Sequence, residues 1–134
     1  MFLKKEFTFD AAHKLEQYHG KCEALHGHTY RLEITLEGMP GAEGMVMDFL
    51  ALKDLVKTHA LSYLDHAYLN DVISQPTAER IALWIWNQID GRISHENCSL
   101  YSVQVWETAT SSVVIHREDA EAAGPGFSPE AVKH

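Results

Sequence analysis

The chain has 134 residues, of which 46% are hydrophobic and 22% charged, and its formal net charge is −8. This length suits one domain with a hydrophobic core, and the acidic balance argues against a protein that binds nucleic-acid backbones. The two cysteines, Cys22 and Cys98, do not suggest a disulfide framework. No segment reads as a signal peptide or membrane span, so we expect reduced thiols in a cytoplasmic protein without a membrane partner.

Two alternating segments open the chain. Apolar and polar residues alternate over 2–12 and again over 26–36, and a period of two predicts strands. His13 follows the first segment in register. Residues 14–25 between them are polar and irregular, which indicates a loop.

Two helices are predicted in the middle of the chain. Asp48 is a plausible N-cap for a helix with apolar residues at helical spacing over 49–56. Thr77 is the expected N-cap of a second helix, in which Ile81, Ile85 and Ile89 lie on one face.

Residues 101–106 and 112–116 alternate again and are most simply read as a hairpin. The order β-β-α-α-β-β predicts an α+β fold, with a four-stranded antiparallel sheet and two helices on one face. Residues 1–117 should form a single domain, and residues 118–134 a weakly ordered tail. The edges of so small a sheet would be exposed, which favours oligomerisation through them.

Three of the nine histidines stand at predicted strand ends: His13, His26 and His28. His26 and His28 are two residues apart, so both rings point to the same face of an extended strand. Three imidazoles with an open fourth position describe a catalytic zinc site. The alternative is that His26 and His28 simply line a polar strand face.

Cys22 lies four residues before His26. It could be a fourth metal ligand, a buried inert thiol, or a nucleophile or base whose pKa a nearby metal lowers. A base needs a partner that holds the proton, and Asp65 with His66 offers one. Equally, Asp65 and His66 could simply end a helix.

Glu107 follows a predicted strand. A carboxylate at a strand end can accept two hydrogen bonds from adjacent N–H groups of a planar heterocycle. The ordinary interpretation is that Glu107 is a solvated residue in a turn. The simplest interpretation of Thr77 and Glu79 is structural. Thr77 would cap the second helix, and Glu79 would be an acidic residue in its first turn that interacts favourably with the helix dipole.

Taken together, six segments resemble the 6-pyruvoyl-tetrahydropterin synthase family, and within it the bacterial 6-carboxy-tetrahydropterin synthases of queuosine and 7-deazapurine synthesis. They occur in family order and span the chain to about residue 116. The segments are Phe9–His13, Cys22–His28, Met47–Phe49, Leu64–Asn70, Pro76–Glu79 and Glu107–Thr108.

The resemblance implies a tunnelling fold, in which the sheets of several subunits close into a barrel, commonly in a hexamer built as a dimer of trimers. It implies one zinc ion held by His13, His26 and His28, and Cys22 as the proton-abstracting residue. Asp65 and His66 would relay the proton, and because sites of this family lie at subunit interfaces, the pair could serve the Cys22 of a neighbouring subunit.

For the substrate, the resemblance implies 7,8-dihydroneopterin triphosphate, with Glu107, Thr108 and Thr77 binding the pterin. The product would be 6-carboxy-5,6,7,8-tetrahydropterin, formed with release of triphosphate and acetaldehyde. The alternatives are a 6-pyruvoyl product or a non-catalytic zinc- or pterin-binding module. A folate-type variant is disfavoured, because Cys22 is present and Leu25 stands where that variant has glutamate.

Overall fold

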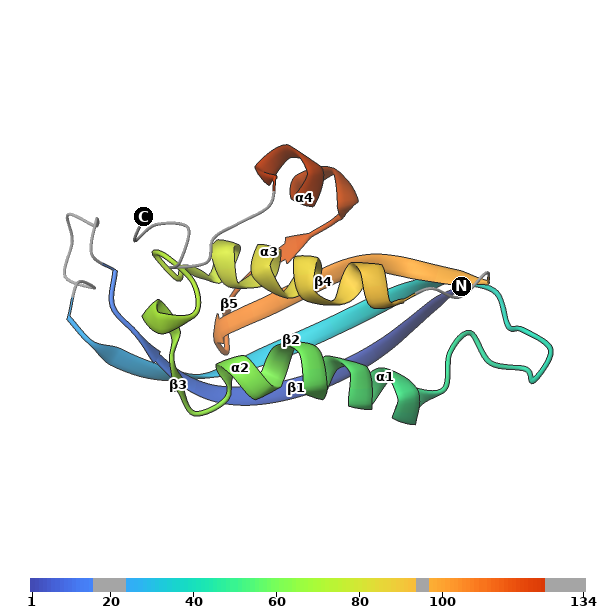
Figure 1. Ribbon diagram of the computed structural model, residues 1–134, viewed down its shortest axis with the longest axis horizontal. Coiled ribbons are helices and arrows are strands. Elements are labelled where there is room, and N and C mark those ends of the chain that lie inside the picture. The colour runs from blue at the N-terminus through green and yellow to red at the C-terminus, as the bar shows by residue number, and fades with distance from the viewer. Residues whose placement is uncertain (16–23, 94–96, 125–134) are drawn as a thin grey trace.

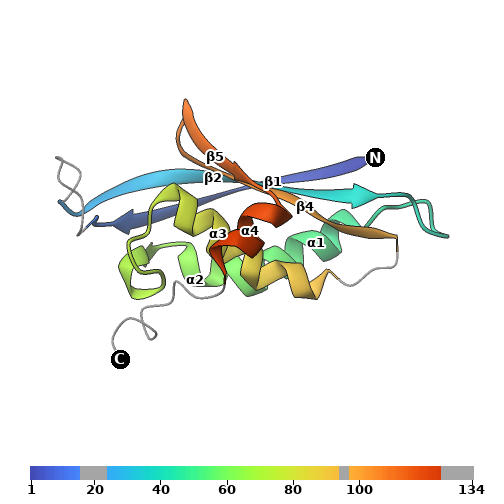
Figure 2. The same cartoon turned by 90° about the horizontal axis from the view of Figure 1, so that it is seen from above.

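The computed structural model describes residues 1–15, 24–93 and 97–124. One sheet runs through the molecule, and the helices cover only one of its faces (Figures 1 and 2). The strands are β1 (Phe2–His13), β2 (His26–Gly38), β3 (Ala67–Tyr68), β4 (Cys98–Thr108) and β5 (Ser111–Ile115). Their order across the sheet is β3-β1-β2-β4-β5.

The alternation predicted from the sequence fixes which side chains face the helices. In β1, Phe7, Phe9 and Ala11 are buried, and Glu6, Thr8 and Asp10 are exposed. In β2, Tyr30, Leu32 and Ile34 are fully buried. Because these side chains all lie on the helix-covered face, the core is the layer between sheet and helices.

The helices begin where the sequence predicts. The Asp48 side chain accepts a hydrogen bond from the Leu50 N–H and caps α1 (Phe49–Val56), which continues as a π-helical turn over Lys57–Leu61 and as α2 (Ser62–Leu64). The Thr77 side chain caps α3 (Ala78–Ile89) in the same way, by accepting from the Arg80 N–H. Short 3-10 turns at Leu69–Asp71 and Asp90–Arg92 complete this part of the chain.

The predicted sheet is wrong in one respect. It is mixed and five-stranded, because β3 pairs in parallel with β1 through Ala11↔Ala67 and Ala12↔Tyr68. The other neighbours are antiparallel, as expected. The two-residue β3 is too short to show an alternating pattern, so periodicity does not reveal it.

A further helix, α4 (Arg117–Ala123), follows β5 where the sequence analysis places the start of a weakly ordered tail. Arg117 donates two hydrogen bonds to the carboxylate of Asp90, at 3.0 and 2.9 Å, and this pair joins α4 to the end of α3. The Asp90 carboxylate raises the pKa of the Arg117 guanidinium above its ordinary value. Residues 125–134 lie outside the described part of the chain.

Candidate metal centre and substrate site

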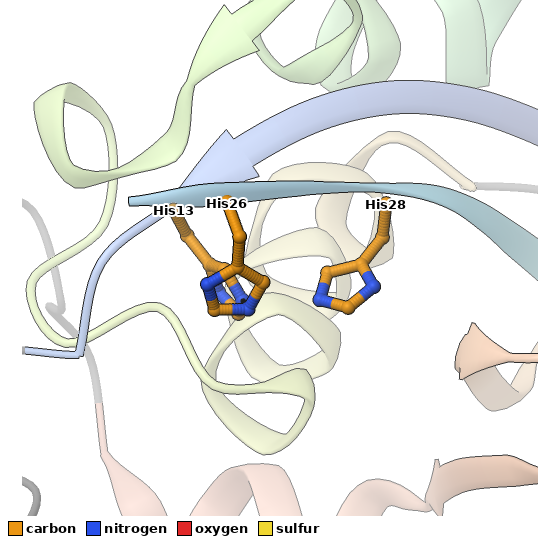
Figure 3. Close-up of side chains that lie close together, drawn as sticks. All are labelled: His13, His26 and His28. Carbon is orange, nitrogen blue, oxygen red and sulfur yellow. Dashed lines mark hydrogen bonds between the residues drawn. The ribbon is translucent and has the colours of Figure 1, made fainter. Parts of the chain in front are cut away.

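His13, His26 and His28 meet at one end of the sheet. His13 is the last residue of β1, and its direct partner across the β1–β2 ladder is His26. His28 lies two residues further along β2, on the same face. Figure 3 shows the three rings projecting to the same side of the two strands. The backbone register thus brings together the three histidines that the sequence singles out.

The hydrogen bonds that His13 and His26 form through Nδ1 leave the Nε2 atoms of these two rings available as metal ligands. His13 Nδ1 lies 2.8 Å from the carbonyl oxygen of Pro76, and His26 Nδ1 lies 2.7 Å from that of Ala24. A carbonyl only accepts, so each Nδ1 carries the proton and each Nε2 keeps a lone pair. Metal-bound histidines are commonly oriented by such a second hydrogen bond.

The Nε2 atoms of His13 and His26 are 3.0 Å apart, close to the separation of about 3.3 Å expected for two nitrogens on one tetrahedral zinc ion. His28 Nε2 is buried and has no hydrogen-bond partner among the described residues. The ligand atoms of all three histidines lie within 4.8 Å of one another. An orphaned buried nitrogen beside two converging lone pairs fits a bound metal ion, so the three residues form a group that can hold one.

Burial also suits these residues to metal binding. His13 is 1% exposed, and desolvation lowers the pKa of His28 below its ordinary value. Glu107 opposes this shift, while His13 and His26 add to it. The same burial raises the pKa of Tyr30, whose hydroxyl lies 3.4 Å from His13 Nδ1, so the phenol stays protonated. A neutral imidazole is the form that binds a metal.

Glu107 lies beside the three histidines. Its carboxylate oxygens are 3.8 Å from His28 Nε2 and 3.9 Å from His13 Nε2. Glu107 also lines a cavity of about 270 Å³ between the start of α3 and the β4–β5 turn. Thr77 and Glu79 line the same cavity, so the residues that open α3 face the carboxylate that ends β4. Thr108 is exposed at the end of β4.

Asp65 and His66 lie elsewhere. His66 Nδ1 is 3.1 Å from the Asp65 carboxylate, and both side chains are exposed. Asp10 holds the pair, because its N–H donates to Asp65 Oδ1 at 3.0 Å and its carbonyl accepts from the His66 N–H at 2.6 Å. His66 has a φ of 60°, a left-handed conformation that is uncommon outside glycine.

This pair belongs to the open face of the sheet. Asp10, Ala12, Gly27 and Thr29 alternate with the core residues of β1 and β2, and together with His66 they line a hollow of about 510 Å³. His28 also lines this hollow, whereas the buried His13 lies on the helix-covered face.

The sequence reasoning missed the residues that hold these groups in place. They are the carbonyls of Pro76 and Ala24, the Asp10 backbone, Thr29, which donates to the Asp10 carboxylate at 2.5 Å, and Asn70. Asn70 forms two hydrogen bonds with the backbone of Lys14, directly after His13. Asp10, Ala24, Pro76 and Asn70 fall within the segments that carry the family resemblance, and Thr29 falls outside them. Cys22 lies outside the described residues.

A sequence profile described as 6-pyruvoyl tetrahydropterin synthase matches residues 2–118. The chain belongs to this family. It is 38% identical to the 6-carboxy-5,6,7,8-tetrahydropterin synthase of Haemophilus influenzae, over 81% of this chain and 94% of the relative. It is 42% identical to the Synechocystis protein of the same name, over 81% and 87%.

Two further comparisons show the breadth of the family. The chain is 42% identical to a Pyrococcus furiosus protein named dihydroneopterin monophosphate aldolase, over 75% of this chain and 83% of that protein. The solved structure of Caenorhabditis elegans 6-pyruvoyl tetrahydropterin synthase superposes with a TM-score of 0.77 at 25% identity, over 87% and 94% of the two chains. The family match supports an enzyme that acts on a small pterin, and the fold is that of these synthases.

Among the described residues, no helix is long and apolar enough to cross a membrane.

Proposed function

We propose that this chain converts 7,8-dihydroneopterin triphosphate to 6-carboxy-5,6,7,8-tetrahydropterin, releasing triphosphate and acetaldehyde, in queuosine or 7-deazapurine synthesis. The observation that carries the proposal is the convergence of three histidine Nε2 atoms beside the carboxylate of Glu107. The two bacterial relatives that bear the name of this activity support the choice of product.

His13, His26 and His28 would hold one zinc ion through their Nε2 atoms. A zinc ion bound there supplies a Lewis acid that polarises the side-chain hydroxyls of the substrate. Glu107 would accept hydrogen bonds from the N–H groups of the pterin ring, and charge-assisted pairs of this kind fix both position and orientation. Because Glu107 lies within 4 Å of two of the histidines, a ring bound by it sits next to the metal centre. Thr77 and Thr108 would flank the ring.

Cys22 would remove a proton from the carbon that carries a hydroxyl, as a thiolate favoured by the nearby metal charge. His66 would take this proton onward, with Asp65 stabilising the charged imidazole. Both side chains of the pair are exposed, and neither forms an ion pair with the three histidines among the described residues, which supports a role for the pair in the site of a neighbouring subunit. We therefore propose a homo-oligomeric barrel, hexameric as a dimer of trimers, as the active form.

The proposal is tested by incubating the zinc-loaded protein with 7,8-dihydroneopterin triphosphate and identifying the products by mass. The expected result is 6-carboxy-tetrahydropterin with trapped acetaldehyde in equal amount. A pyruvoyl product without acetaldehyde would instead assign the biopterin-type reaction. The Pyrococcus furiosus relative raises a second candidate, so dihydroneopterin monophosphate is offered in parallel, and its faster cleavage would favour an aldolase. Tight pterin binding without turnover would make the chain a binding module.

A further inference from the structure

Both edges of the sheet present unpaired backbone groups in the described part of the chain. On its outer side, β1 has a partner only at Ala11 and Ala12, where β3 lies, so the edge over residues 2–9 is free. At the other end of the sheet, β5 pairs with β4 alone. Exposed edges of this kind are templates for pairing with another chain. Since β1 and β5 run in opposite directions, they can continue the antiparallel sheet from one copy to the next.

The helices beside these two edges differ. Figure 1 shows α1 beside β1 and α4 on the opposite side of the molecule, beyond β5. The strand register shows at which level of the sheet α4 begins. Across the sheet, Ile115 pairs with Val103, Val103 with Ile34, and Ile34 with Lys5, so Ile115 lies at the level of Lys5. Arg117, the first residue of α4, follows two positions later. If β5 of one copy pairs with β1 of the next at this same level, α4 approaches the neighbour beside the first half of its β1, which includes Lys5.

Lys5 belongs to a hollow of about 280 Å³ at the β1 edge, which we call the lysine groove. Lys5, Lys53 and Lys57 are its cations, and it is also lined by Glu6, Phe7, Thr8 and Leu61. No ion pair or hydrogen bond joins these three ammonium groups to a described residue. Lys53 and Lys57 are four residues apart on successive helical turns, so their like charges repel. Glu6 does not neutralise the groove, since its carboxylate is directed to Arg31 at 3.5 Å.

The exposed surface of α4 is acidic. Glu118, Asp119 and Glu121 are exposed, and Asp119 already accepts a hydrogen bond from the His116 N–H in a capping box. Glu118 and Glu121 form no ion pair within the described residues, although both raise the pKa of the neighbouring Arg117. The bidentate Arg117–Asp90 pair holds α4 against α3, so these carboxylates are presented from a fixed helix.

We propose that α4 of one copy docks on the lysine groove of the next, with Glu118 and Glu121 facing Lys53 and Lys57. The proposal rests on the homo-oligomer included in the proposed function, and adds to it a specific contact between copies. It is heterologous, because two different surfaces of the same chain meet, and such contacts generate a ring when the rotation between copies closes. It brings the carboxylates of Glu118 and Glu121 to Lys53 and Lys57, which form no ion pair with any described residue.

The test is a charge swap in the full chain. In the variants Lys53→Glu/Lys57→Glu and Glu118→Lys/Glu121→Lys, like charges face each other across the contact. We expect the subunit dissociation constant, measured by sedimentation velocity, to rise on the order of tenfold in each, and more at low salt. The fourfold variant restores opposite charges and should return to within a few-fold of the parent. Glu43→Lys, an exposed acid before α1, is the control and should assemble normally.

Two results would overturn the contact. In the first, both double variants have the same subunit dissociation constant as the parent. In the second, the fourfold variant assembles no more tightly than the weaker of the two double variants. Circular dichroism of each variant checks that the subunit is folded. Zinc content reports separately on the three histidines, which all belong to one chain. If the parent forms the expected product but the swap has no effect, the contact fails and the function stands. If the swap rescues assembly but no product forms, the function fails and the contact stands.

Discussion

His13 Nδ1 donates a hydrogen bond to the carbonyl oxygen of Pro76 at 2.8 Å, across a buried contact between the end of β1 and the residue before the N-cap of α3. This bond orients one of the three histidines that we propose as zinc ligands, and it comes from the residue before α3, whose first residues line the cavity next to Glu107. In the proposed site, the placement of the metal and of the substrate would therefore be coupled through a single backbone carbonyl.

Replacing His28 with alanine should abolish stoichiometric zinc binding, because the remaining two nitrogens leave the ion with too few ligands. The expected zinc content, measured by atomic emission after dialysis, is near zero. His59→Ala, in the π-helical turn after α1, is the matched control and should keep one zinc per chain. Full zinc content in His28→Ala would show that the ion is held elsewhere.

Replacing Cys22 with alanine should lower kcat by about 10²- to 10⁴-fold, the range for loss of a general base, without loss of zinc. Cys98→Ala serves as control, because burial raises the pKa of the Cys98 thiol and leaves it unreactive at neutral pH. Zinc loss together with activity loss in Cys22→Ala would instead make Cys22 the fourth ligand.

Replacing Glu107 with glutamine keeps the shape of the side chain and removes its charge. We expect kcat/KM to fall by about 10- to 100-fold, since a hydrogen bond to a charged group contributes on the order of 1.5–3 kcal/mol. Zinc content should not change, because Glu107 lies beside the three histidines and is not one of them. An unchanged kcat/KM would exclude the carboxylate from pterin binding.

Replacing Gly38 with alanine should destabilise the fold. A Cβ at Gly38 would overlap the carbonyl oxygen of Asn97 and lie 2.7 Å from the Cα of Cys98, and both are backbone atoms of the paired segment. Overpacking of this kind costs about 1–3 kcal/mol in the free energy of unfolding, measurable by urea denaturation. Gly91→Ala, where a Cβ meets nothing within 4 Å, should be close to neutral. Equal stabilities of the two variants would contradict this packing.

Much of the fold is predictable because its signals are local. The strict alternation of apolar and polar residues predicts which side chains of β1 and β2 face the core. The capping residues Asp48 and Thr77 mark the starts of α1 and α3. The same alternation puts His26 and His28 on one face, and the direct pairing of His13 with His26 completes the group.

The parts that the sequence did not predict depend on contacts distant in the chain. The link between Asp10 and Asp65 joins residues 55 positions apart, and no local pattern encodes it. Helix α4 was missed because its core contact is a single buried residue, Ala120, so its acidic sequence carries no clear amphipathic period. Its anchor, the pair between Arg117 and Asp90, spans 27 positions and is equally invisible in a local window.

The residues that flank the segment between His13 and His26, two of the proposed metal ligands, are held by hydrogen bonds at both ends. Asn70 clamps the backbone of Lys14, just after His13, and the carbonyl of Ala24 accepts from His26. Residues added or removed between these two points leave His13 and His26 in place, and the entropic cost of a longer loop grows only slowly with its length. We therefore expect that insertions or deletions in this segment during evolution would leave the three proposed ligands together.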